Sequence, residues 1–214
     1  MPPIAPSVRP RLRGVFHQWA LLAALPLGIA LVLGADGPRG RLAAAVFALS
    51  VVAMFGASAL YHRVTWSPSR RLWLRRLDHA GIYGLIAGTY TPFGLLVLEG
   101  GWQATVLAIV WTGAALAILQ KLAWPQAPKW IAVVLAVGLG WVGAIVFPQL
   151  FANAGATATL LVLGGGVLYT VGALVYVFER PNPAPATFGY HEIFHLLVVA
   201  AVGLQAAAVA IVVL

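Results

Sequence analysis

The stretch that decides the fold is HEIFHLLVVAAVGLQAAAVAIVVL, residues 191–214, in which a polar start leads into an almost wholly apolar run. About 20 apolar residues in a helix cross the hydrocarbon layer of a membrane. Only helices or closed barrels satisfy their own backbone in that layer, and barrel strands alternate in polarity over about 10 residues. The stretch shows no such alternation, so it predicts a membrane-spanning helix with polar residues at one end.

Similar apolar runs recur along the 214 residues, which are 62% hydrophobic and 8% charged. Connections rich in Gly and Pro, such as GADGPRG and PNPAPATFG, separate them. The predicted spans are 15–34, 41–61, 77–98, 102–122, 130–148, 156–178 and 191–214. We therefore expect an all-α integral membrane protein, with a basic tail at 1–14 and a single seven-helix transmembrane domain at 15–214.

Positive charge gathers on one side of these spans. Of the 13 Lys and Arg residues, all but Arg39 and Arg41 flank the side that carries the N-terminus, beginning with Arg9, Arg11 and Arg13. Basic flanks stay in the cytoplasm, which predicts a cytoplasmic N-terminus and an outside C-terminus. The net charge of +8 is assigned to this orientation rather than to nucleic-acid binding. The alternative for the first span is a cleaved signal peptide, which would leave six spans.

Ionisable residues inside apolar spans are costly and need a partner or a function. Here all five histidines fall toward the predicted cytoplasmic side, and cysteine is absent, so a metal would need nitrogen or oxygen ligands. In HEIFH, His191 and His195 are four residues apart, which places both on one face of a helix and suits two imidazoles on one metal. A hydrogen-bonded core pair is the alternative.

A third imidazole from His62 would complete three ligands and leave one position for water, as in catalytic zinc sites. Asp78 would then orient or deprotonate that water. The alternative role of Asp78 is structural, as a carboxylate near a helix N-terminus that is stabilised by Arg75 or Arg76. Ser58 stands four residues before His62 in SALYH, where on its own it is interpreted as a hydroxyl that bonds to a helical carbonyl.

Three other residues are expected to support the ligands rather than to bind the metal. His79 lies about 100° around the helix from Asp78. Glu192 points away from the HEIFH histidines and is expected to pair with Arg180 or with the arginine-rich loop between the second and third spans. His17 is the weakest candidate, because a lone histidine at the start of a span is usually interfacial.

SALYH, LDHAGIYGLIAGTYTPF and HEIFH, in this order on the second, third and seventh spans, resemble the bacterial hemolysin III branch of the progestin and adipoQ receptor (PAQR) family. The resemblance covers most of the chain. It implies seven helices and a zinc ion near the cytoplasmic leaflet of the bacterial inner membrane. It further implies zinc ligands, a neighbouring carboxylate and a nearby serine, which match His62, His191, His195, Asp78 and Ser58. The motif RPRLRGVFH departs from relatives that have Glu and Asn ahead of the first-span histidine, so no role is transferred to it.

The family's zinc site is similar to that of alkaline ceramidases, which implies hydrolysis of an amide or ester of a membrane lipid and a part in membrane-lipid homeostasis. The alternatives are a non-catalytic sensor in which zinc staples helices together, and a haem protein, which would leave Asp78 without a role. A pore-forming haemolysin is disfavoured because the polar residues stop at one face. We thus expect a candidate zinc-dependent lipid amidohydrolase whose partner is a membrane lipid. The sequence leaves its oligomeric state open.

Overall fold

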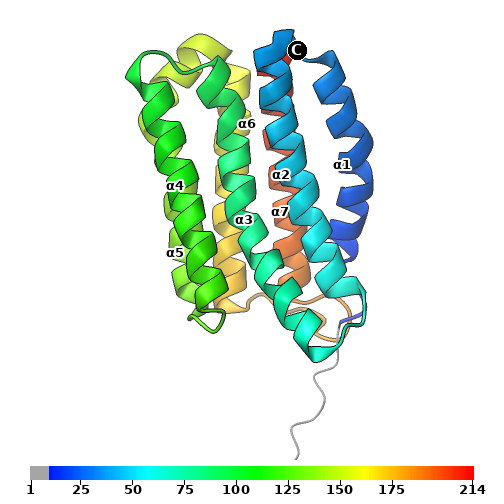
Figure 1. Cartoon of the computed structure of the whole chain (residues 1–214). Coiled ribbons are helices and arrows are strands. Elements are labelled where there is room, and N and C mark those ends of the chain that lie inside the picture. The colour runs from blue at the N-terminus through cyan, green and yellow to red at the C-terminus, as the bar shows by residue number, and fades with distance from the viewer. Residues whose placement is uncertain (1–9) are drawn as a thin grey trace, which may run out of the picture.

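The computed structural model describes residues 10–214 as a bundle of α-helices standing side by side (Figure 1). Arg9 and the rest of residues 1–9 lie outside the described part. The elements are α1 (Val15–Gly34), α2 (Gly37–Arg63), α3 (Pro68–Leu96), α4 (Gly101–Ala123), α5 (Lys129–Gly140), the 3-10 helix η1 (Val142–Val146), α6 (Phe147–Phe178) and α7 (Tyr190–Val213). The predicted all-α class is confirmed, since no strand forms between residues 10 and 214.

The 50-residue run Lys129–Phe178 doubles back on itself. Midway along it, the side-chain amide of Asn153 donates to the carbonyl of Val97, beside the loop between α3 and α4. At the opposite end of the bundle, the first residue of the run forms an ion pair with Glu179. Gly155 adopts φ 82° and ψ 171°, which interrupts α6 near the predicted break between 148 and 156. Both ends of the run therefore lie at the same end of the molecule.

Five stretches of the described chain are long and apolar enough to cross a membrane: α1, α2, α4, the run Lys129–Phe178 and α7. The sequence predicts seven spans, and two of these fall within the long run. The third predicted span, 77–98, largely coincides with α3, which is not among the five. Gly, Thr, Tyr and His residues lower its hydropathy, and α3 packs against α2, α4, α5 and α7, where polar groups can find partners. The protein is a multi-pass helical membrane protein.

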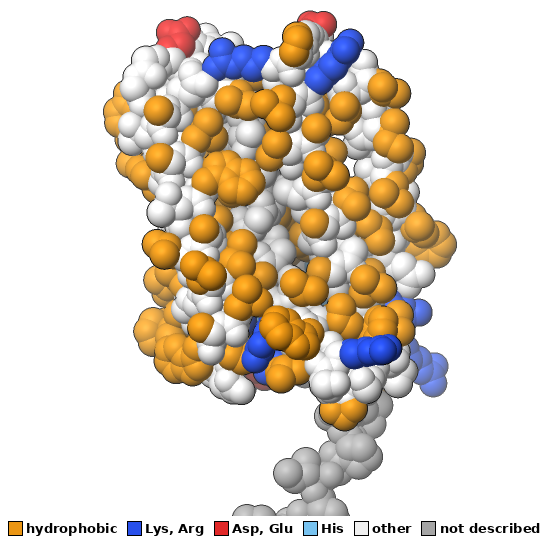
Figure 2. Space-filling model, in the orientation of Figure 1, with side chains coloured by type: hydrophobic (Ala, Val, Ile, Leu, Met, Phe, Trp, Pro, Cys, Tyr) orange, Lys and Arg blue, Asp and Glu red, His pale blue; other side chains and the backbone are white. Residues whose placement is uncertain are grey.

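Apolar side chains cover the sides of the bundle, while charged side chains gather at its two ends (Figure 2). One end holds Arg39 and Arg41, at the start of α2. All other described Lys and Arg residues lie near the opposite end, in the segment before α1 or close to the α2–α3, α4–α5 and α6–α7 connections. We call this the arginine-rich end. A hydrogen bond of 2.8 Å from the backbone N–H of Asp36 to the carbonyl of Val213 places the C-terminus at the end that holds Arg39 and Arg41.

Close packing between α2 and α3 positions the polar residues at the arginine-rich end. A Cβ atom on Gly88 of α3 would lie 2.2 Å from the Oγ of Ser50 on α2, so the two helices could not approach this closely with any larger residue. One turn farther along α2, toward the arginine-rich end, buried Met54 and Phe55 fill the space between α2 and its neighbours. The packing brings the last turn of α2 next to the first turns of α7 and to α3.

Candidate metal centre

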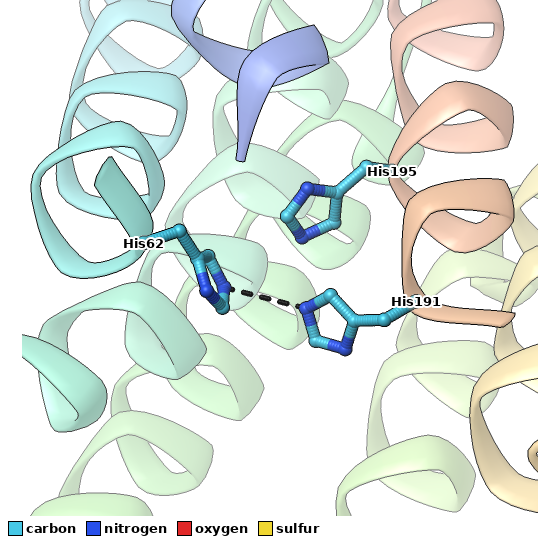
Figure 3. A group of neighbouring side chains, drawn as sticks. All are labelled: His62, His191 and His195. Carbon is cyan, nitrogen blue, oxygen red and sulfur yellow. Dashed lines mark hydrogen bonds between the residues drawn. The ribbon is translucent and has the colours of Figure 1, made fainter. Parts of the chain in front are cut away.

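Three histidines from two helices converge at the arginine-rich end (Figure 3). His62 lies in the last turn of α2, while His191 and His195 lie in the first two turns of α7, on one face as their spacing predicts. One ring nitrogen from each can be chosen so that all three lie within 4.8 Å of one another. His62 and His195 are buried and His191 is half-buried. This group could hold a metal ion.

One pair of ring nitrogens has the spacing of two zinc ligands. Tetrahedral zinc, with zinc–nitrogen bonds of about 2.0–2.1 Å, separates two ligand nitrogens by roughly 3.3 Å. The Nε2 atoms of His62 and His191 are 3.3 Å apart. The ring of His62 meets those of His191 and His195 at 69° and 65°, so the imidazoles do not stack and their nitrogens face a shared space. Imidazole nitrogens also suit copper, iron and nickel, so the donor set selects a transition metal rather than calcium or magnesium.

Asp78 faces the same space from α3. Its Oδ2 lies 3.5 Å from the Nε2 of His62. The alternative raised by the sequence, an ion pair with Arg75 or Arg76, does not form within residues 10–214. The carboxylate is therefore aimed at the histidine group, where it could accept a proton from a water molecule lying between them.

His17 is buried beside the three histidines. Its side chain is 3% exposed, and its ring stacks on that of His195 with centroids 3.8 Å apart and planes at 10°. Its Nδ1 lies 2.8 Å from the Oγ of Ser58. Ser58 thus contacts an imidazole, which the interpretation as an ordinary helical hydroxyl did not foresee. Both residues are placed to orient His195 and its surroundings.

The expected partner of Glu192 was wrong. Glu192 is fully buried, and its Oε1 lies 2.6 Å from the Nε of Arg13, while no ion pair with Arg180 forms among the described residues. Its Oε2 accepts a hydrogen bond of 2.8 Å from the backbone N–H of Gly189, which caps the first turn of α7. Backbone hydrogen bonds also join the segment before α1 to the α6–α7 connection. The described part of the predicted N-terminal tail is therefore fixed against the helix that carries two of the three histidines.

Gly14 brings this segment into contact with His62. Its φ is 77°, and a Cβ atom there would lie 2.5 Å from the Cβ of His62. We expect Gly14→Ala to displace His62 and to weaken metal binding by the three histidines about tenfold or more, the range seen when residues that hold a ligand are changed. Titration of purified protein against a chelating dye measures this effect. Gly100→Ala is the matched control, because Gly100 has φ 60° but no atom within 4 Å of its Cβ position. Equal metal affinity in both variants would show that Gly14 does not help to position His62.

A cavity of about 640 Å³ adjoins the histidines, within the range of small-molecule sites. The three histidines, Asp78 and His79 line it at the arginine-rich end. His79 thus stands beside the group without belonging to it. Thr89 and Tyr90 line the middle, and apolar side chains such as Val146 and Leu150 line the part farther from the histidines. An apolar chain could lie along the cavity with a polar group next to the histidines.

A protein-family model described as "Haemolysin-III related" matches residues 7–206. The chain belongs to the haemolysin III-related family. It is 32% identical over 187 residues to "Hemolysin-3" of Bacillus cereus, a match that covers 86% of this chain and 82% of the relative. It is also 33% identical over 135 residues to "Hemolysin-3 homolog" of Bacillus subtilis, which covers 63% of each chain. The family resemblance drawn from SALYH, the third-span run and HEIFH is confirmed.

Two features of this haemolysin III-related chain were missed from the sequence. The contacts of residues 10–14 were missed because arginines before a span look the same whether they are solvated or packed. A glycine directly ahead of the first span was the available signal for a close approach. The burial of Lys121, at the end of α4, was missed because a single lysine there resembles any flanking charge.

Proposed function

We propose that this protein is a zinc-dependent hydrolase that cleaves an amide or ester of a membrane lipid and thereby serves membrane-lipid homeostasis. The observation that carries the proposal is the approach of three imidazoles and one carboxylate at the polar end of an otherwise apolar cavity. Three histidine ligands leave a fourth position for a reactant, as in catalytic zinc sites. A staple that only held helices together would not need a cavity beside it.

The side chains divide the chemistry between them. Bound zinc would supply an acidified water and would polarise the carbonyl of the lipid. His62, His191 and His195 hold the ion. The carboxylate of Asp78 accepts the proton of the attacking water and returns it to the leaving amine or alcohol.

Ser58 supports Asp78 in this scheme, because its hydroxyl acts on the Asp78 carboxylate as a hydrogen-bond donor and its side chain does not line the cavity. A hydroxyl can donate only one hydrogen bond. For Ser58 to donate to Asp78, its neighbour His17 must carry a proton on Nδ1 and donate a hydrogen bond to the Oγ of Ser58, across the 2.8 Å contact. His17 is therefore a positioning residue in this scheme, because it acts through Ser58 and through its stacking on His195.

We further propose seven membrane crossings, with a cytoplasmic N-terminus, an outside C-terminus and the metal centre near the cytoplasmic leaflet of the bacterial inner membrane. The doubling back of Lys129–Phe178 and the enclosed position of α3 support the count of crossings. The concentration of Lys and Arg at the arginine-rich end supports the orientation. A water-filled pore is disfavoured, because apolar side chains such as Leu98, Val146 and Leu150 line the cavity away from the histidines.

Removing the metal tests the proposed activity directly. In proteoliposomes that contain lipid amides and esters, we expect zinc-loaded protein to release fatty acid. Dialysis against a chelator should reduce the rate at least about a hundredfold, since the ion supplies several kcal/mol of transition-state stabilisation. Adding zinc should restore the rate, and circular dichroism of the metal-free sample checks that the helices remain. Hydrolysis that persists after elemental analysis shows complete metal removal would rule out the proposed mechanism.

A further inference from the structure

Lys121 is a buried cation for which the described chain provides no counter-charge. It lies in the last turn of α4, is 4% exposed and lines the cavity. Within residues 10–214 it forms no hydrogen bond or ion pair, and the charge that acts on it is that of Arg75, a second cation. A buried charge is costly unless it is paired. Lys121 therefore calls for an anion from outside the described chain.

The other cations of the cavity wall, apart from Arg75, have partners. Arg13 forms its ion pair with Glu192. Lys129 forms one with Glu179. Neither Arg75 nor Lys121 has a carboxylate within ion-pair distance in the described structure. Two cations of the cavity wall, close enough for the charge of Arg75 to act on Lys121, are thus left without a carboxylate partner.

Asp78 does not neutralise this pair. Among the described residues that line the cavity it is the one carboxylate, and its ion-pair contact is with His62. A cation bound by the histidines would engage it further and would add positive charge to the same region. His79, the next residue on α3, is subject to the field of both Lys121 and Arg75. The uncompensated pair therefore stands beside the metal centre and within the same cavity.

Membrane orientation does not explain a cation in this position. Arg63, Arg70 and Arg71 lie at the same end of the bundle and are exposed, so water and lipid head groups can solvate them. Charge of this kind is sufficient to orient the chain. Placing Lys121 in the cavity wall removes water from its ammonium group, which costs free energy, and does not improve the orientation of the chain in the membrane. The cost is offset only if something binds there.

We propose that Lys121 and Arg75 bind the anionic head group, a phosphate or a carboxylate, of the lipid that occupies the cavity. The proposal rests on the proposed function, whose substrate class it specifies as an anionic lipid. A guanidinium can bind either oxyanion through two parallel hydrogen bonds, and an ammonium adds a compact charge. With the head group held there, the acyl chain lies along the apolar wall, and the amide or ester faces Asp78 and the histidines.

Equilibrium binding to the purified, zinc-loaded full chain in detergent tests this assignment. The probes share one acyl chain and differ in head group: lysophosphatidate, free fatty acid, lysophosphatidylcholine and monoacylglycerol. We expect the two anionic probes to bind about tenfold or more tightly than the uncharged glyceride, as charge-assisted hydrogen bonds are about twice as strong as neutral ones. Equal affinities would overturn the proposal. Inorganic phosphate that competes as well as lysophosphatidate would assign the pair to a free anion and overturn the lipid assignment.

Substitutions of the two cations test whether they cause the preference for anionic probes. Lys121→Gln and Arg75→Gln should each remove most of the preference for anionic probes, and Lys121→Arg should retain it. Arg70→Gln, which removes an exposed cation near the start of α3, is the matched control and should leave the preference unchanged. An unchanged preference in Lys121→Gln would overturn the proposal.

A stability measurement separates binding from a structural role. Because Lys121 lacks a partner, Lys121→Gln should leave or raise the thermal midpoint of lipid-free protein. A lowered midpoint would show that the lysine supports the fold, and would also count against the anion site.

The anion site and the hydrolase can fail separately. Head-group preference is a binding property, so it should persist in Asp78→Asn even without turnover. Preference without hydrolysis in the unmodified protein would retain the anion site and contradict the enzyme. Hydrolysis with no head-group preference would retain the enzyme and overturn the anion site.

Discussion

Asp78→Asn is expected to lower lipid hydrolysis about a thousandfold while one zinc ion per chain stays bound. The amide of Asn cannot accept the proton of the attacking water, and general-base catalysis contributes roughly 10²- to 10⁴-fold. Zinc should remain, because the three imidazoles do not depend on the charge of Asp78 to reach one another. The measurement combines the initial rate of fatty-acid release with elemental analysis of the same preparation.

Asp36→Asn is the matched control for this substitution. Asp36 is exposed at the opposite end of the bundle, next to the C-terminus, so its variant should keep the full rate. The result also separates the enzyme from a zinc-stapled sensor. If Asp78→Asn keeps its cellular function while variants of the histidines lose it, the sensor is favoured and the catalytic role of Asp78 is excluded.

His191→Ala is expected to reduce bound zinc from about one ion per chain to nearly none. Only two imidazoles, on different helices, would remain, and three protein ligands are the usual minimum of a catalytic zinc site. Elemental analysis of protein purified without added metal measures the loss. An absorption spectrum of the unmodified protein, recorded alongside, distinguishes colourless zinc from haem, which would give a visible Soret band.

The matched control for this loss is His79→Ala. His79 lines the same cavity but stands outside the group of three histidines, so its variant should keep its zinc. Full zinc content in His191→Ala, or an equal loss in His79→Ala, would show that a different set of residues binds the ion.

The sequence by itself determined most of the helices and the shared face of two of the three histidines. Apolar runs about as long as a membrane is thick predicted α1, α4 and α7 nearly to their ends, because Gly, Pro and charged residues interrupt each run. The spacing of four in HEIFH predicted that His191 and His195 share a face, since helical periodicity is a local property. The run 68–76 was left out of the third span because its arginines interrupt the apolar pattern, yet it continues α3 as a helix.

Only the tertiary structure decided which polar groups meet across helices. The stacking of His17 on His195, the pairing of Arg13 with Glu192 and the burial of Lys121 all join or enclose residues far apart in the chain. Such contacts depend on how each helix is rotated. In a soluble protein the apolar stripe would reveal that rotation, but a membrane helix is apolar toward lipid as well as toward its neighbours. Its sequence therefore predicts a crossing without specifying which side faces the site.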